Sequence, residues 1–243
     1  MGLDGQHGPL VIRAAALGLS LWAAPLAADA PCRLALQLGF DVSASVDAAE
    51  YQLQRAGIAA ALLAPEIVTG FLHGPGHVAL SIFEWSGRFQ QELVLDWLRV
   101  TSRADLEAIA ATVMAHPRSA QDGPTAIGYA LGFAATRFDT APDCLFQTVD
   151  ISGDGANNDG FPPGAAFTHF DFDGVTVNGL AIGGAANDIA RYFAEQLIRG
   201  PGAFTEYAAS YADFAPALRR KLERELRVMI LGGLALPTGQ LPL

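Results

Sequence analysis

The sequence predicts an α/β fold: a Rossmann-like, doubly wound sheet that is mostly parallel, with one antiparallel edge strand and helices on both faces. Apolar runs of strand length alternate with helix-length segments, which is the pattern of βαβ units. Residues 78–85 and 89–97 depart from this pattern, because only a short turn separates two strand-like runs, and they predict a hairpin. The chain has 243 residues and is 51% hydrophobic, which is enough for one domain around its own core.

Helix caps and turn residues define the elements in the first half of the chain. An apolar strand leads to a helix that Asp47 caps, with Glu50 completing a capping box three residues later. Ser102 caps a second helix, with Asp105 in its first turn. The predicted elements are strand 34–40, helix 47–63, loop 70–76, the hairpin strands 78–85 and 89–97, and helix 102–115.

The second half continues the alternation of strands and helices. Thr125 opens a helix whose apolar residues recur at i, i+4, i+7 and i+11. The last helix is charged on most faces over residues 219–227, which is typical of a solvated helix. The predicted elements are the helix from residue 125, strand 143–151, loop 152–164, helix 164–170, strand 175–182, helix 187–199, strand 203–208 and helix 211–228.

The two ends of the chain are predicted to lie outside this domain, which covers residues 31–228. Residues 1–30 have the pattern of a secretory signal peptide, with Arg13, an apolar stretch and cleavage after Ala30. The alternative is an apolar helix docked on the domain. Residues 229–243 form an apolar tail that is too short to span a bilayer and is expected to be poorly ordered. The sequence therefore predicts an exported protein, periplasmic or secreted, with no stable membrane span after cleavage.

Charge and cysteine content narrow the function classes. The formal net charge is −10 and the sequence pI is about 4.8, which argues against nucleic acid or an anionic membrane as the main partner. Two cysteines are too few for a Cys-based zinc site or a disulfide-rich framework.

Three stretches place oxygen-bearing side chains where a doubly wound sheet binds ligands, beyond the carboxyl ends of its strands. Two carboxylates and three hydroxyls are too few anionic ligands to cage Ca²⁺ tightly, but they fit Mg²⁺, with Mn²⁺ and Ca²⁺ as alternatives. The competing interpretation is that these side chains only cap helices. The candidate metal ligands are Asp41, Ser43, Ser45, Thr125 and Asp154.

These stretches resemble the metal-ion-dependent adhesion site (MIDAS) of von Willebrand factor type A (VWA) domains. The Asp-x-Ser-x-Ser motif of that family falls on Asp41, Ser43 and Ser45, its Thr on Thr125 and its second Asp on Asp154. The resemblance covers residues 33 to about 228. Residues 149–158 and 84–86 also resemble a bacterial exported subgroup that is classed as a domain of unknown function (DUF1194-like).

The resemblance implies a VWA fold, a divalent cation held by the five side chains directly or through water, and a partner protein whose Asp or Glu completes the coordination. One departure concerns the second carboxylate. Where the family often reads Thr-Asp-Gly, this chain has an added residue, Gly153, before Asp154, which leaves the position of that carboxylate open.

The cysteines fit the same topology. Cys32 lies nine residues before Asp41, and Cys144 lies ten residues before Asp154. If the two strands are parallel and adjacent, both cysteines lie near their amino ends and within reach of a disulfide. An exported protein would retain that bond. The alternative is two free thiols.

The function predicted from the sequence is metal-dependent binding of a partner protein through the partner's carboxylate. One alternative is a metal-dependent hydrolase that uses the same cleft, and another is a structural module with a degenerate metal site. Glu84 ends a strand expected beside that of Asp41, so it is a candidate base near the metal, but a structural carboxylate is the simpler interpretation. The sequence assigns no catalytic residue.

Overall fold

Strand β1 (Cys32–Asp41) forms the middle of the sheet, and all ten of its residues are buried. The structure, a computed structural model, describes residues 1–2, 30–183 and 188–232. In these residues six strands pair in the order β3-β2-β1-β4-β5-β6. Burial on both faces explains why β1 is an almost continuous apolar run instead of an alternating one. The other strands are β2 (His77–Trp85), β3 (Gln91–Val100), β4 (Cys144–Gly153), β5 (Val175–Ile182) and β6 (Thr205–Ala208).

The sheet is parallel except at one edge. β1 pairs in parallel with β2 and with β4, and β5 pairs in parallel with β4 and with β6. β3 runs antiparallel to β2 at the edge. This confirms the predicted mostly parallel sheet with one antiparallel edge strand from the hairpin. The carboxyl ends of β1 and β4 therefore meet at the same edge of the sheet.

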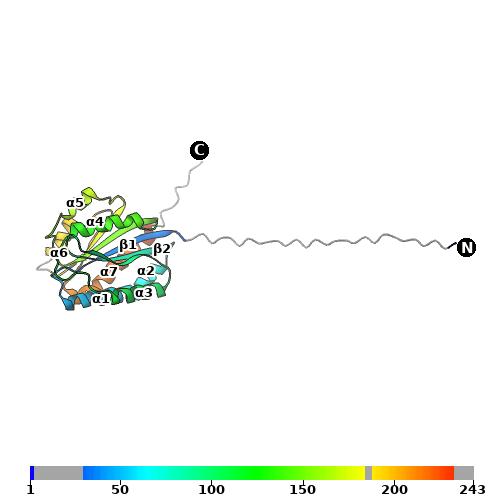
Figure 1. Cartoon of the computed structure of the whole chain (residues 1–243), viewed down its shortest axis with the longest axis horizontal. Helices are drawn as coiled ribbons and strands as arrows, with labels where there is room; N and C mark the ends of the chain where they lie inside the picture. The colour runs from blue at the N-terminus through cyan, green and yellow to red at the C-terminus, as the bar shows by residue number, and fades with distance from the viewer. Residues whose placement is uncertain (3–29, 184–187, 233–243) are drawn as a thin grey trace.

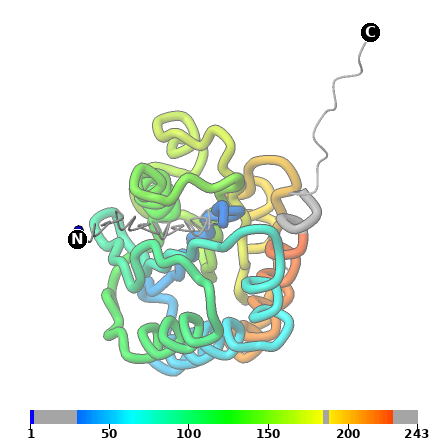
Figure 2. The backbone as a smooth tube through the Cα atoms, turned by 90° about the vertical axis from the view of Figure 1, so that its right-hand side faces the viewer, coloured from blue at the N-terminus to red at the C-terminus, as the bar shows by residue number. Residues whose placement is uncertain are grey.

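Helices cover both faces of the sheet, and Figures 1 and 2 show the three layers. The helices are α1 (Ala48–Leu62), α2 (Pro65–Leu72), α3 (Arg103–Ala115), α4 (Ile127–Arg137), α5 (Pro163–His169), α6 (Asp188–Tyr192) and α7 (Phe214–Gly232). Leu36, Leu38 and Phe40 of β1 face α1, α2, α3 and α7. Val149 and Ile151 of β4 face α4, α5 and α6 on the other side. Short helical turns are η1 (Phe138–Thr140), η3 (Phe193–Leu197, a π-helix) and η4 (Tyr211–Asp213).

The helix caps confirm the local predictions. Asp47 accepts a hydrogen bond from the Glu50 backbone N–H (2.8 Å), and the Glu50 carboxylate accepts one from the Asp47 N–H (2.9 Å). Ser102 and Asp105 form the same capping box at α3. The predicted loop at residues 70–76 is wrong over its first three residues, because α2 extends to residue 72. α2 begins with proline at its first position, a helix-start pattern that the sequence analysis overlooked.

Several further boundaries differ from the predictions. α4 begins at residue 127, with Ala126 as its N-cap, instead of at Thr125, and β3 covers residues 91–100 instead of 89–97. β4 extends two residues beyond the predicted end at residue 151, because Ser152 and Gly153 continue the parallel pairing with β5. α7 continues to residue 232 instead of ending at 228. The predicted signal peptide lies almost entirely in residues 3–29, outside the described residues, and so do the tail residues 233–243.

The predicted solvated face of the last helix is wrong at two positions. Lys221 and Glu225 are buried, with 0% and 3% of their surface exposed. The Lys221 ammonium lies 2.6 Å from Glu225 Oε1 and 2.9 Å from Asp150 Oδ2 on β4, and Asn178 on β5 donates to Glu225 Oε1 (2.7 Å). The charges point inward because the sheet below α7 supplies polar partners, which a helical pattern alone cannot reveal.

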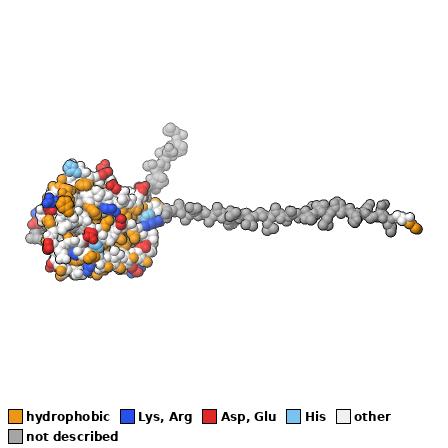
Figure 3. All heavy atoms as spheres, viewed as in Figure 1, with side chains coloured by type: hydrophobic (Ala, Val, Ile, Leu, Met, Phe, Trp, Pro, Cys, Tyr) orange, Lys and Arg blue, Asp and Glu red, His pale blue; other side chains and the backbone are white. Residues whose placement is uncertain are grey.

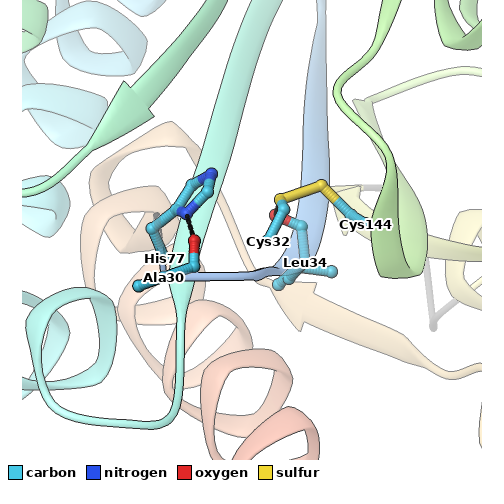
Figure 4. Close-up of a disulfide and its surroundings, with 5 residues drawn as sticks. All are labelled: Ala30, Cys32, Leu34, His77 and Cys144. Atoms are coloured by element: carbon cyan, nitrogen blue, oxygen red, sulfur yellow. Dashed lines mark hydrogen bonds between the residues drawn. A yellow bond between two sulfur atoms is a disulfide. The ribbon is translucent and has the colours of Figure 1, made fainter. Parts of the chain in front are cut away.

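The predicted disulfide between Cys32 and Cys144 is confirmed. The two residues are register partners at the amino ends of β1 and β4, and their Cα atoms are 4.4 Å apart (Figure 4). Next to it, the His77 Nδ1 atom is 2.9 Å from the Ala30 carbonyl oxygen (Figure 4). The bond joins the two strands that carry Asp41 and Asp154 at their other ends.

Reduction of this disulfide is expected to lower the free energy of unfolding by about 2–4 kcal/mol. The bond joins residues 112 positions apart and so restricts the conformations of the unfolded chain, and this restriction is lost on reduction. Denaturant unfolding of the oxidised protein and of the Cys32→Ala/Cys144→Ala double variant measures the difference. Equal midpoints would contradict the expectation.

No single helix in the described ranges is long and apolar enough to cross a membrane, although α1 and α2, which meet at a 58° bend, together pass the same test by length and composition. On the face of the molecule in Figure 3, acidic, basic and apolar side chains are interspersed. The basic side chains on that face do not gather into a continuous surface of the kind that nucleic acid requires.

Candidate metal site

The Asp-x-Ser-x-Ser stretch forms a tight turn directly after β1. The Ser43 N–H donates to Asp41 Oδ1 (2.8 Å), so the carboxylate folds back over the turn that follows it. The Val42 N–H donates to the Trp85 carbonyl of β2 (2.9 Å) and anchors the start of the turn to the neighbouring strand. α1 then begins three residues after Ser45.

Hydrogen bonds join the other four predicted ligands, which come from three separate loops. Thr125 Oγ1 donates to Ser43 Oγ (3.4 Å), Ser43 Oγ lies 3.0 Å from Ser45 Oγ, and Ser45 Oγ donates to Asp154 Oδ1 (2.6 Å). The structure therefore brings all five predicted residues together at the carboxyl edge of the sheet. The added Gly153 does not carry Asp154 away, because Gly153 is the last residue of β4 and Asp154 still reaches Ser45.

Asp41 lies at the closed side of the site. Its side chain is 0% exposed, and its Oδ2 atom has no hydrogen-bond partner in the described structure. Burial, reinforced by the charge of Asp154, raises the pKa of Asp41 to about 7, although hydrogen bonds from Ser43 and the nearby backbone N–H of Asp154 act against this rise. A side chain at Gly153 would lie 3.0 Å from Asp41 Oδ2, so glycine leaves space beside that oxygen. A buried carboxylate oxygen without a partner is the type of group that a cation stabilises.

The opposite side of the site is open. Ser45 is exposed and Asp154 is half-buried, whereas Ser43 and Thr125 are buried. Burial raises the pKa of Asp154, and the nearby Glu50 charge adds to this rise. A hollow of about 300 Å³ beside Asp154 is lined by Glu50 and Tyr211, among others. The site therefore has a closed floor at Asp41 and an accessible rim at Ser45 and Asp154.

Arg118 holds the Asp-x-Ser-x-Ser turn from the side, a role that the sequence analysis did not identify. Its Nη2 group donates to the carbonyl oxygens of Val42 (3.0 Å), Ser43 (3.0 Å) and Val46 (2.7 Å). The guanidinium also lies over the Tyr51 ring, 5.5 Å from its centroid. No local pattern relates Arg118 to residues more than 70 positions earlier, so only the fold reveals this contact.

Asn158 holds the Thr125 loop in a similar way. Its Oδ1 atom accepts a hydrogen bond from the Thr125 N–H (2.8 Å), and the N–H groups of Asn158 (2.9 Å) and Asp159 (3.2 Å) donate to the Thr125 carbonyl. Asn158 lies four residues after Asp154, so one short loop supplies a candidate ligand and fixes the backbone of another. A second link connects the loops directly, because the Ala44 N–H donates to the Gly123 carbonyl (2.8 Å).

Glu84 is engaged in structural contacts. Its Oε1 atom accepts a hydrogen bond from the Tyr51 hydroxyl (2.7 Å), and its Oε2 atom accepts one from the Ser119 N–H (2.9 Å). The side chain of Glu84 is buried, and His116 Nε2 lies 4.0 Å from Oε2. Glu84 therefore ties α1 and the α3–α4 loop to β2 and contacts none of the five candidate ligands in these bonds.

The donor set is made mostly of neutral hydroxyls. Within the described residues, no group of three or more His, Cys, Asp or Glu side chains is placed to hold a metal ion. The candidate site contains two carboxylates and three hydroxyls, a set of oxygen donors that suits a hard cation and differs from a zinc site built on His and Cys.

A comparison with protein families identifies a match over most of the chain. The model of the family described as "Protein of unknown function (DUF1194)" matches residues 31–230. Among curated proteins, none matches the chain.

Solved structures with the same fold are VWA domains and pilus proteins. Proximal thread matrix protein 1 from the mussel byssus, with a zinc-occupied MIDAS motif, aligns with a TM-score of 0.60 at 16% identity over 82% of this chain and 49% of its own. A von Willebrand factor type A protein from Catenulispora acidiphila gives 0.55 at 17% identity over 80% and 43%. The PilB minor pilin from Streptococcus sanguinis gives 0.57 at 12% identity over 88% and 65%. The aligned region spans about half the length of the mussel protein, and these similarities establish a VWA-like fold.

Proposed function

Because the chain belongs to the DUF1194 family and has a VWA-like fold, we propose that it is an exported binding module that uses a divalent cation to engage another protein. Mg²⁺ is the proposed cation, with Mn²⁺ and Ca²⁺ as alternatives. A partner's Asp or Glu would complete the coordination. The proposed ligands, directly or through water, are Asp41, Ser43, Ser45, Thr125 and Asp154.

The observation that carries this proposal is the convergence of five oxygen-bearing side chains on one point, beside a buried Asp41 oxygen that has no partner within the described structure. Helix capping alone does not account for that oxygen. A cation at this position would offset the cost of burying the Asp41 charge and would leave the exposed Ser45 side for a partner.

Two structural neighbours support the proposed metal-dependent binding. A mussel byssus protein with this fold holds zinc at its MIDAS motif, and a pilus adhesin of Lactobacillus rhamnosus GG also has the fold (TM-score 0.57, 14% identity over 83% of this chain and 31% of its own). One of these proteins belongs to the byssus and the other to a pilus, which is consistent with export of this chain. A MIDAS motif that holds zinc in one and the adhesin role of the other support the proposal of metal-dependent binding for this chain.

A hydrolase is the weaker alternative. A metal-activated water also needs a general base within reach. Glu84, the carboxylate considered for that role, has both oxygens engaged by Tyr51 and Ser119. No contact of Glu84 favours catalysis over binding.

Mg²⁺ is expected to raise the melting temperature of the protein, because a ligand at 100 times its Kd adds about 2.7 kcal/mol of stability, or roughly 5–10 °C for a domain of this size. Asp154→Ala is expected to remove the rise. Differential scanning calorimetry with Mg²⁺ and with a chelator measures it. Asp143→Ala is a matched control, because Asp143 is an exposed carboxylate just before the opposite end of β4. No rise in wild type, or an equal rise in Asp154→Ala, would overturn the proposed metal site.

The partner is tested separately. Capture of exported proteins on immobilised wild type should depend on Mg²⁺ and be lost with chelator and with Asp41→Ala. Captured proteins should lose binding when their exposed Asp and Glu side chains are converted to amides. An interaction that survives both chelation and Asp41→Ala would contradict bridging by the metal.

A further inference from the structure

We propose that Asn158 is a positioning residue that gives the site its preference for Mg²⁺ over Ca²⁺. The inference rests on the proposed metal site and assigns a role to a residue outside the set of candidate ligands. Its basis is the way in which Asn158 fixes the Thr125 backbone relative to the loop that carries Asp154.

Thr125 is held on both sides of its backbone by one short segment. Its N–H donates to Asn158 Oδ1 (2.8 Å), and its carbonyl accepts from the N–H groups of Asn158 (2.9 Å) and Asp159 (3.2 Å). Thr125 itself is 4% exposed, so its hydroxyl has little freedom once the backbone is fixed. The spacing between the Thr125 hydroxyl and the Asp154 carboxylate is thus set by the five-residue segment 154–158.

Other contacts hold the turn that carries Ser43 and Ser45. Arg118 donates to the carbonyls of Val42, Ser43 and Val46. The Ala44 N–H donates to the carbonyl of Gly123, two residues before Thr125. The Ser86 hydroxyl donates to the Pro124 carbonyl (3.0 Å) and joins the end of β2 to the same loop. All three ligand-bearing loops are therefore linked to one another. The Asn158 side chain links the loop that carries Asp154 to the loop that carries Thr125.

A set of ligands in rigid positions discriminates between cations by size. Mg²⁺ requires near-octahedral geometry at about 2.0–2.1 Å, whereas Ca²⁺ accepts irregular geometry at about 2.3–2.6 Å. Loosening one brace should therefore weaken Mg²⁺ binding more than Ca²⁺ binding. Partners that orient metal ligands typically contribute about 10–100-fold in affinity, and we expect the lower end because Asn158 is exposed.

Asn157, the neighbouring residue, provides a matched control. Its Oδ1 atom accepts from the Gly128 N–H in the first turn of α4 (3.2 Å), and its Nδ2 group donates to the Asp159 carbonyl (3.1 Å). It makes none of the three hydrogen bonds to the Thr125 backbone. Asn157→Ala should thus lower stability through the lost cap and leave the ratio of Mg²⁺ to Ca²⁺ affinity unchanged.

Isothermal titration of the full-length protein with Mg²⁺ and with Ca²⁺ tests the inference. Asn158→Ala should weaken Mg²⁺ binding about tenfold and Ca²⁺ binding less than about threefold. Asn158→Gln, which displaces the amide oxygen by one methylene, should act in the same direction and replaces the alanine variant if that variant does not fold. Asn158→Asp keeps an acceptor for the Thr125 N–H and should restore the wild-type ratio.

The outcomes separate this inference from the proposed function. If wild type binds no cation, both are overturned. If wild type binds Mg²⁺ but Asn158→Ala and Asn158→Gln keep the wild-type ratio, or if Asn157→Ala changes the ratio as much, the role of Asn158 is overturned and the metal site stands. A fall in the melting temperature without a change in the ratio would identify Asn158 as a structural residue only.

Discussion

Asn in place of Asp41 is expected to abolish the stabilisation by Mg²⁺ and to make the metal-free protein more stable above pH 7. Asn has nearly the same shape as Asp but cannot supply an anionic oxygen to the cation. It also removes a charge from a side chain that is 0% exposed. The same substitution should therefore change stability in opposite directions with and without metal.

The pH dependence follows from the pKa of Asp41. Burial raises this pKa to about 7, above its usual value of 3.8, so the folded protein keeps the proton to a higher pH than the unfolded chain. The contribution of Asp41 to stability is complete below pH 4 and is lost progressively as the pH rises through 7. The loss amounts to about 4 kcal/mol, because each unit of pKa difference corresponds to about 1.4 kcal/mol.

Urea unfolding between pH 4 and pH 8 in the presence of chelator measures this effect. The difference in the free energy of unfolding between wild type and Asp41→Asn isolates the contribution of Asp41. Other groups that titrate in the same range, such as Asp150, contribute equally to both proteins. The variant should be the more stable protein at pH 8, and the difference in the free energy of unfolding should decrease towards pH 4. A difference that does not change with pH would exclude Asp41 as the titrating group.

Replacement of Lys221 by Met is expected to lower the free energy of unfolding by about 3–5 kcal/mol at pH 8, because it leaves two buried carboxylates without their cation. Asp150 and Glu225 are 1% and 3% exposed, so water cannot replace the ammonium. Burial alone would lower the pKa of Lys221, but the two carboxylates raise it, and the residue stays charged in the folded protein. Urea unfolding measures the loss.

The neighbouring residue supplies the control. Arg220 pairs with Glu206 at 2.7 Å, with side-chain exposures of 53% and 24%, so Arg220→Met should cost less than about 1 kcal/mol. Burial raises the pKa of Asp150 to about 7 even beside Lys221, so acid should relieve much of the defect in Lys221→Met by protonating Asp150. Equal losses for the two substitutions, or a defect that grows towards pH 5, would contradict a buried charge cluster.

Local patterns in the sequence predicted much of this protein because their physical causes are local. The capping boxes at Asp47 and Ser102 depend on residues three positions apart, and the hairpin depends on one short turn. The alternation of strands and helices limits the sheet to a mostly parallel order, and that order brings Cys32 and Cys144 into register. The five candidate ligands could be selected for the same reason, since each lies where a strand ends or shortly before a helix begins.

The tertiary structure alone decided the contacts that have no local pattern. Arg118 binds carbonyls more than 70 positions away, and Asn158 fixes Thr125 from a loop 33 positions later. Lys221 and Glu225 have the sequence pattern of a solvated helix, yet the sheet buries them against Asp150. A polar side chain shows in the sequence what it can donate or accept. Which group it meets depends on the packing of layers that are distant along the chain, because desolvation acts on the assembled core and not on a segment.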